Sequence, residues 1–225
     1  DVLVLSLADE NAVESVLFGE VAPSLTAGTV VLDTTTVSPS YARRSVERLA
    51  ETGVRGVEVR VVGNADMARA GQLRIFTGGD QATVDSVRPL LSAMGKETHH
   101  LGPAGHASAL KLALNLLLGV QTAGLAEAAR LADAAGIGRD GLLDVVLNSG
   151  WRSPVLAFRA ERMRRREYEP AGFRAELMHK DLDLAMRCAE GMPLPLTSRA
   201  AQRYGEIVAQ GRGDEDAAVL VELDR

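Results

Sequence analysis

One apolar stretch, Gly102 to Gly136, constrains the fold of this chain more than any other part of the sequence. The stretch is rich in alanine and leucine, which favour helices, and it predicts one long helix. Pro103 suits the first turn of a helix, and Gly136 suits the left-handed turn that ends one. Because a helix that is apolar on most faces must be buried, we expect the rest of the chain to pack around it.

Two polar residues, Lys111 and Asn115, interrupt the apolar first half of this helix. They are four residues apart, so they share one face and can contact one ligand together. One interpretation is structural: the lysine lays its stem on the core with its ammonium in water, and the asparagine is a satisfied polar neighbour. The other is a lysine that faces a cleft, where desolvation prepares it for proton exchange. The spacing alone leaves both interpretations open.

Composition narrows the class of protein. The chain has 225 residues, of which 46% are hydrophobic, enough for one large or two small globular domains. The net charge of −5 argues against nucleic acid or an anionic membrane as a partner. With Cys188 as the single cysteine, we expect neither a disulfide framework nor a bound metal. The apolar run Leu110 to Val120 is too short to span a bilayer, and no signal peptide is visible, so we expect a cytoplasmic protein.

Residues 1–102 alternate apolar strands with helices. The expected strands are Val2 to Leu7, Thr29 to Asp33, Gly56 to Val62, Leu73 to Thr77 and Lys96 to Leu101. The expected helices between them are Asp9 to Phe18, Ser40 to Thr52, Ala65 to Ala70 and Asp80 to Met94. This alternation predicts an α/β domain with a parallel or mostly parallel sheet and helices on its faces. Ligands of such sheets bind at the carboxyl ends of the strands, which here carry Leu7-Ala8, Thr34 to Thr36, and Val62-Gly63-Asn64.

Residues 103–225 carry only helix signals and predict an all-helical second domain that starts with the long helix. The further helices expected are Arg139 to Asn148, Ser153 to Arg166, Phe173 to Glu190, Leu196 to Gln210 and Glu215 to Leu223. The loop from Asn148 to Ser153 offers several hydrogen-bond donors, although a capped loop with Trp151 as a core plug is the preferred interpretation. Lys180 and Asp181 are either a surface charge pair or part of a site. The basic run from Glu161 to Glu169 is interpreted as a solvated helix end.

The chain starts at Asp1 inside an apolar strand, with no initiator methionine. Because proteins rarely begin inside a core strand, we expect further residues upstream of Asp1.

Four segments, in this order, resemble the β-hydroxyacid dehydrogenase family, whose members include 3-hydroxyisobutyrate dehydrogenase and the imine reductases. The first is DVLVLSLADENAVESVLFG, which resembles the strand and helix that follow the family's first cofactor-binding half. The others are VLDTTTVSPSYAR, similar to "D-x-S-T-x-S-P", then GHASALKLALNLLL, similar to "G-x-x-x-K-x-x-x-N", and FRAELMHKDLDLA, similar to "F-x-x-x-L-x-x-K-D-L". The resemblance extends from Asp1 to the C-terminus.

The resemblance implies an NAD(P)-dependent dehydrogenase or reductase, with NAD or NADP bound to a Rossmann-like domain and the active site between this domain and a helical one. In the family, the helix lysine moves the proton and its asparagine neighbour helps to hold the substrate, which implies these roles for Lys111 and Asn115. The dinucleotide contacts of the family fall on Leu7, Ala8, Thr35 and Thr36, and Lys180 falls near cofactor and substrate. The family also pairs through its helical half, which implies a homodimer or a larger homo-oligomer.

The chain departs from the family pattern at two places. The glycine-rich dinucleotide fingerprint is absent from residues 1–225, and we expect it upstream. The substrate loop "D-A-P-V-S-G-G" appears here as residues 58–64, EVRVVGN, with Val62, Gly63 and Asn64 at its substrate-binding end. Val62 replaces the serine that binds the acid's carboxylate, and valine has no hydrogen bond to donate.

These departures leave alternatives open for the function. A dehydrogenase acting on a hydroxy acid or a related carbonyl compound is the first. Lys111 favours it, because imine reductases commonly lack this lysine. An imine reductase-like enzyme is the second, since Val62 favours a less acidic substrate. A non-catalytic member that binds a nucleotide or a partner subunit is the third.

Overall fold

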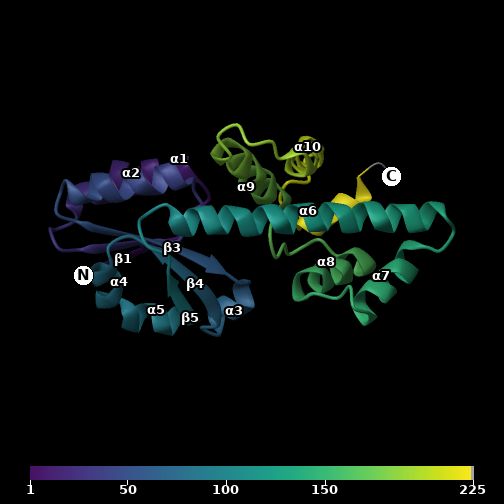
Figure 1. Ribbon diagram of the computed structural model, residues 1–225, viewed down its shortest axis with the longest axis horizontal. Helices are drawn as coiled ribbons and strands as arrows, with labels where there is room; N and C mark the ends of the chain where they lie inside the picture. The colour runs from purple at the N-terminus through teal and green to yellow at the C-terminus, as the bar shows by residue number, and fades with distance from the viewer. Residues whose placement is uncertain (224–225) are drawn as a thin grey trace. The chain divides into compact units, whose positions relative to one another are not determined.

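The computed structural model describes residues 1–223, which form two compact units (Figure 1). The first unit is residues 1–113, and the second begins at Leu114. The division falls inside helix α6, His106–Ala134, which is continuous across it. The long helix predicted from the alanine- and leucine-rich stretch is therefore confirmed. By length and composition alone, α6 would be long enough to cross a membrane, a weak criterion that core helices also meet.

The first unit is built on a five-stranded sheet with the strand order β1-β2-β3-β4-β5. The strands are β1 Val2–Leu5, β2 Val30–Asp33, β3 Arg55–Val62, β4 Leu73–Gly78 and β5 Gly95–His100. All neighbours pair in parallel except β3 and β4, which are antiparallel. Residues 63–72 connect these two strands, and this segment is too short for the crossover that parallel strands need. The mostly parallel sheet predicted from the sequence is confirmed.

Short helices connect the strands, and side chains cap several of them. They are α1 Glu10–Val13, a π-helix Glu14–Val21, a 3-10 turn Ala22–Ser24, α2 Pro39–Ala50, α3 Ala65–Arg69, α4 Gln81–Ser86 and α5 Arg88–Met94. Asp9, Ser38 and Asp80 accept hydrogen bonds from the first turns of their helices, as such caps do. The helix expected over Asp80 to Met94 is broken at Val87. Pro89 explains the break, because its ring cannot continue an α-helix from the preceding turn.

Apolar side chains alternate along the strands and form a core on each face of the sheet. Val31 packs with Tyr41 and Leu49 of α2 on one face, while Leu32 packs with Ile75 of β4 on the other. Figure 1 shows α1 and α2 covering one face and α4 and α5 covering the other. This period-2 alternation produces the two-sided burial of a Rossmann-like sheet.

The second unit is helical, as the sequence predicts. After α6 it contains α7 Arg139–Asn148, α8 Pro154–Arg165, α9 Ala175–Cys188, α10 Pro195–Ala209 and a 3-10 helix Ala217–Glu222. The helix expected over Glu215 to Leu223 is thus a 3-10 helix. The buried Asp216 carboxylate fixes the first turn of this 3-10 helix. It accepts hydrogen bonds from the backbone N–H groups of Gly172, Phe173 and Ala218.

The prediction that the Trp151 side chain fills the core is wrong. Its side chain is 75% exposed in the turn between α7 and α8. The core beneath this turn is already filled by residues such as Leu143, Val146 and Met163, which belong to the two helices themselves.

Candidate functional site

The ends of β1 and β2 lie side by side and are joined by hydrogen bonds. The Leu7 N–H donates to Thr35 Oγ1 over 3.1 Å, and the Thr34 N–H donates to the Leu5 carbonyl over 2.8 Å. The Thr35 N–H in turn donates to Asp33 Oδ1 over 2.9 Å. The structure therefore brings together the two segments in which the sequence predicts dinucleotide contacts. Ala8, which follows Leu7, is exposed, and Thr36, which follows Thr35, is half-buried.

Lys111 is fixed at the carboxyl end of β3. Its Nζ donates a hydrogen bond to the Val61 carbonyl over 2.9 Å, and its side chain is half-buried. Val61 directly precedes Val62, Gly63 and Asn64, the predicted substrate-binding end of the loop, so the ammonium is bonded next to them in the chain. The lysine therefore does not simply extend into solvent, and its ammonium is fixed at the strand end.

The loop after Val61 has a defined backbone. Gly63 has a φ of 152°, and a Cβ at this position would lie 2.7 Å from Leu73 Cδ2, so a larger residue would strain the backbone and displace the Leu73 side chain. Asn64 caps α3, where its side chain accepts the Met67 N–H over 2.9 Å. Val62 is half-buried. Gly63 and Asn64 thus shape the turn itself, whatever they bind.

Asn115 and Lys180 meet at one buried carboxylate in the second unit. Asn115 Nδ2 donates to Asp181 Oδ2 over 2.5 Å, and Lys180 Nζ lies 3.2 Å from Asp181 Oδ1. Asp181 is 1% exposed, so the interpretation of Lys180 and Asp181 as a surface charge pair is wrong. α6 and α9 approach closely at Gly119, where a Cβ would lie 3.0 Å from Leu182 Cδ2. The glycine explains how the two buried side chains can reach each other.

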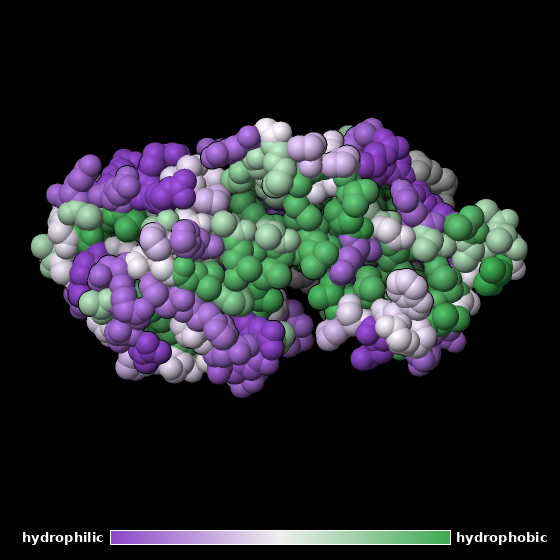
Figure 2. Space-filling view, viewed as in Figure 1, coloured by the Kyte–Doolittle hydropathy of each residue, from purple (hydrophilic) through white to green (hydrophobic). Residues whose placement is uncertain are grey.

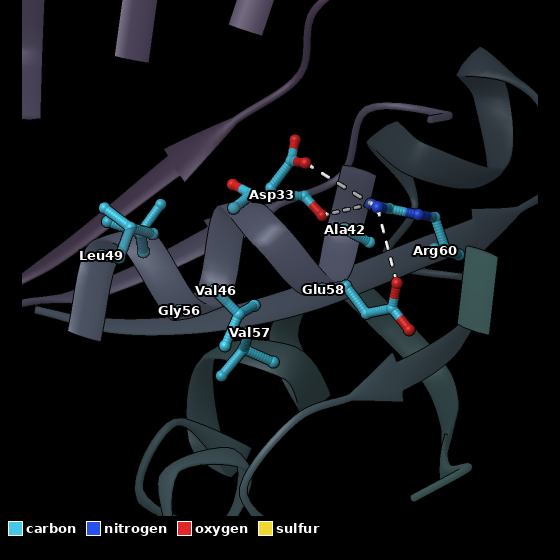
Figure 3. A pocket seen from close by; sticks show the side chains of 10 residues that line it. Asp33, Ala42, Val46, Leu49, Gly56, Val57, Glu58 and Arg60 are labelled. Atoms are coloured by element: carbon cyan, nitrogen blue, oxygen red, sulfur yellow. Dashed lines mark hydrogen bonds and ion pairs between the residues drawn. The ribbon is translucent and has the colours of Figure 1, made fainter. Parts of the chain in front are cut away.

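A second set of buried charges lies in the first unit, around Arg60 of β3 (Figure 3). Its guanidinium lies 3.8 Å from the Asp33 carboxylate and 3.7 Å from the Glu58 carboxylate. The cavity next to these side chains has a volume of about 10 Å³, roughly the room of one water molecule, so it does not hold a ligand. Sequence reasoning missed this cluster. Its signal is the alternation Glu58-Val59-Arg60, which places both charges on one face of the strand.

Within residues 1–223, the structure contains no group of three or more histidine, cysteine, aspartate or glutamate side chains that could hold a metal ion.

Two models of protein families match the chain. Residues 1–102 match the NAD binding domain of 6-phosphogluconate dehydrogenase. Residues 105–223 match the family described as NAD-binding of NADP-dependent 3-hydroxyisobutyrate dehydrogenase. Together the two matches cover both units, and each describes an NAD-binding region.

Individual proteins agree with the family matches. The 2-(hydroxymethyl)glutarate dehydrogenase of Eubacterium barkeri is 34% identical, over 99% of this chain and 75% of that enzyme. The crystal structure of 3-hydroxyisobutyrate dehydrogenase from Salmonella typhimurium superimposes with a TM-score of 0.91 at 28% identity, over 99% of this chain and 79% of that one. The reductive aminase from Aspergillus terreus, solved with NADPH and ethyl levulinate, is 26% identical with a TM-score of 0.60, over 100% of this chain and 79% of that one.

The order of the motifs, the mostly parallel sheet, the helical second unit and these matches agree with one another. The chain belongs to the 3-hydroxyisobutyrate dehydrogenase family of β-hydroxyacid dehydrogenases, with the imine reductases as structural neighbours.

Proposed function

We propose that the protein is an NAD(P)-dependent oxidoreductase that transfers a hydride between nicotinamide and the carbinol or carbonyl carbon of a small hydroxy acid or related carbonyl compound. The observation that carries the proposal is Lys111, whose Nζ is bonded to the Val61 carbonyl at the end of a strand. In parallel sheets, this edge is where ligands bind.

The residues of the first unit suit a nicotinamide cofactor. Leu7 and Thr35 join two neighbouring strand ends, and Ala8 and Thr36 follow them with accessible surface. This arrangement offers hydroxyl and backbone groups to the nicotinamide side of a dinucleotide. When bound, the cofactor supplies the hydride chemistry, and the protein supplies binding, orientation and proton transfer.

Lys111 acts as the acid and base in this proposal. When an alcohol is oxidised, its hydroxyl proton passes to the unprotonated Nζ amine as its carbon gives up a hydride to the nicotinamide, and the reverse reaction returns the proton from the ammonium to the oxygen. The bond to Val61 holds Nζ at the strand end, where a correctly placed proton acceptor is needed. Asn115 and Lys180 bind substrate and cofactor, with their side chains held by Asp181.

The second candidate is an imine reductase-like activity, and Val62 is the observation that favours it. A half-buried valine offers no hydrogen bond to a substrate carboxylate. It fits a less acidic substrate better. The reductive aminase from Aspergillus terreus has a fold similar to that of this chain, which supports this second candidate.

An assay of hydride transfer with the natural protein separates the candidates. The substrates are 3-hydroxyisobutyrate, 2-(hydroxymethyl)glutarate, their non-carboxylated alcohol analogues and a cyclic imine, each with NAD and with NADP. Oxidation of an alcohol that depends on Lys111 supports the first candidate. Imine reduction without alcohol oxidation supports the second. If no substrate is turned over and neither cofactor binds in calorimetry, the enzymatic proposal is wrong and a partner-binding role replaces it.

A further inference from the structure

A continuous set of hydrogen bonds in the first unit starts at the strand ends that we assign to the cofactor. The Leu7 N–H donates to Thr35 Oγ1, and the Thr35 N–H donates to Asp33 Oδ1. Thr35 is 1% exposed and Asp33 is 8% exposed, so water competes little for these bonds. The geometry of this turn is therefore tied to the position of Asp33.

Arg60 extends this set of bonds from β2 to helix α6. Its Nη1 donates to the Asp33 carbonyl over 2.6 Å, and its Nε donates to Ser108 Oγ over 3.0 Å. The Arg60 side chain is 1% exposed, and its charge is balanced by the carboxylates of Asp33 and Glu58 (Figure 3). Because a guanidinium is planar with donors at fixed angles, it sets the direction of both contacts as well as their strength.

Glu58 fastens the start of α6 to the same strand. Its Oε1 accepts the N–H groups of Gly105 and Ala107 over 2.8 and 2.7 Å, and its Oε2 accepts the Ser108 hydroxyl over 2.8 Å. A carboxylate at a helix N-terminus satisfies N–H groups that have no partner in the helix, and it complements the helix dipole. Lys111 lies one turn beyond Ser108 on this helix.

We propose that Arg60 is a positioning residue, which holds the helix that carries Lys111 in a fixed relation to the turn that carries Thr35. The inference rests on the proposed function for its consequence in catalysis, but its structural part stands on the hydrogen bonds of Arg60 and Glu58 alone. Arg60 contacts Asp33 on one side and Ser108 on the other, and Lys111 is bonded to Val61, the next residue of the same strand. A substitution of Arg60 should therefore alter both the turn that carries Thr35 and the start of the helix that carries Lys111.

The choice of variants follows from the buried charges. Replacing Arg60 with a neutral residue would leave two buried carboxylates without a cation, and such a variant risks failing to fold. Arg60→Lys keeps the charge but loses the planar set of donors. Ser108→Ala removes the hydroxyl between Arg60 and Glu58 and leaves all three charges in place. Arg55→Lys is the matched control, since Arg55 lies on the same strand but is exposed and bonds the Gly28 carbonyl.

The first measurement is amide hydrogen exchange on the natural protein, which needs no substrate. For Arg60→Lys and Ser108→Ala, we expect exchange to be about tenfold faster both at the Leu7 and Thr35 amides and in the first turn of α6, the scale of a lost hydrogen bond to a charged group. Exchange in β4 and in the Arg55→Lys control should stay unchanged. A change in only one of the two segments, or an equal change throughout the first unit, overturns the proposal.

The second measurement is steady-state kinetics with the substrate that the assay above identifies. Misplacement of Lys111 lowers kcat by about tenfold or more in Ser108→Ala, because the interaction lost acts on the transition state. A role limited to stability would lower the unfolding temperature and leave kcat per folded molecule unchanged, which would refute the positioning role. If the protein proves to have no redox activity, hydrogen exchange still decides whether Arg60 couples the two segments, and only the proposed function fails.

Discussion

At the scale of single residues, Lys111 is the position where a small change should have the largest effect. Its Nζ is held by the Val61 carbonyl at the end of β3, where the proposed function needs a proton acceptor. We expect Lys111→Ala to lower turnover by about 10²-fold or more, the usual contribution of a general acid–base group. Steady-state rates are the measurement, and Lys96→Ala, at an exposed lysine of β5, is the control. Unchanged turnover in a folded Lys111→Ala protein would show that another group moves the proton.

Val62 is the residue that should decide between substrates. It replaces a serine of the family's loop, and it is half-buried next to the residue that binds Lys111. Val62→Ser restores a donor, and one hydrogen bond to a charged group contributes about 1.5–3 kcal/mol. We therefore expect kcat/KM for 3-hydroxyisobutyrate to rise by about tenfold or more, with no rise for its non-carboxylated analogue. An equal rise for both substrates would mean that the new hydroxyl does not contact a carboxylate.

At the scale of secondary-structure elements, the packing of α6 on α9 depends on one glycine. A side chain at Gly119 meets Leu182 and Met178, whereas Gly124 on the same helix has open space around its Cβ position. Gly119→Leu should lower the free energy of unfolding by about 1–3 kcal/mol through overpacking. Gly124→Ala should instead raise it by up to about 1 kcal/mol, because alanine favours the helix. Urea unfolding of both variants tests this contrast, and equal effects of the two would show that the helices do not approach closely at Gly119.

The same scale shows what the sequence could predict. Apolar periodicity predicted the order of strands and helices along the chain, since this signal is local. The antiparallel pairing of β3 and β4 follows from the short connection between these two strands. The positions of the expected strands and helices along the chain do not give the direction in which neighbouring strands pair. The 3-10 helix Ala217–Glu222 depends on Asp216, whose partners Gly172 and Phe173 are distant in sequence.

The candidate site was predictable only in part for the same reason. Spacing identified Lys111 and Asn115 as residues of one helix face, but their partners lie on other elements. Asp181 binds Asn115 from a position 66 residues away, and Glu58 and Arg60 bind Ser108 from β3. Such contacts are tertiary, so neither periodicity nor spacing along the chain reveals them.

At the scale of the whole molecule, buried tyrosines should limit stability in alkaline solution. Burial raises the pKa of Tyr204 well above the ordinary value of about 10, so its hydroxyl stays neutral in the folded protein. Above pH 10 the unfolded chain loses this proton and the folded protein keeps it, so the stabilisation present below pH 10 is lost as the pH rises. Each such group lowers the free energy of unfolding by about 1.4 kcal/mol per pH unit. Urea unfolding between pH 8 and 11.5 should show this decline, with a smaller slope for Tyr204→Phe. Identical slopes would mean that Tyr204 ionises equally in both states.

The surface of the second unit exposes large apolar side chains. Several of its large apolar side chains are exposed, among them Leu131 (72%), Ile137 (69%), Val145 (58%), Trp151 (75%) and Leu196 (70%). Figure 2 shows hydrophobic surface along α6 and where it meets α7. Monomeric proteins rarely expose large contiguous apolar patches, so this surface fits an interface better than contact with water.

We therefore expect the protein to form a homodimer or a larger homo-oligomer through its helical unit. Analytical ultracentrifugation at micromolar concentration should give a mass of at least two chains. Ile137→Asp should weaken the assembly without unfolding the protein, because this side chain is exposed and a buried, unpaired carboxylate would oppose association. Glu97→Ala, a change on β5 in the first unit, is the control and should leave the mass unchanged. A monomeric wild-type protein would refute the expectation. If Ile137→Asp leaves the assembly unchanged, the interface does not include Ile137 and lies on another face.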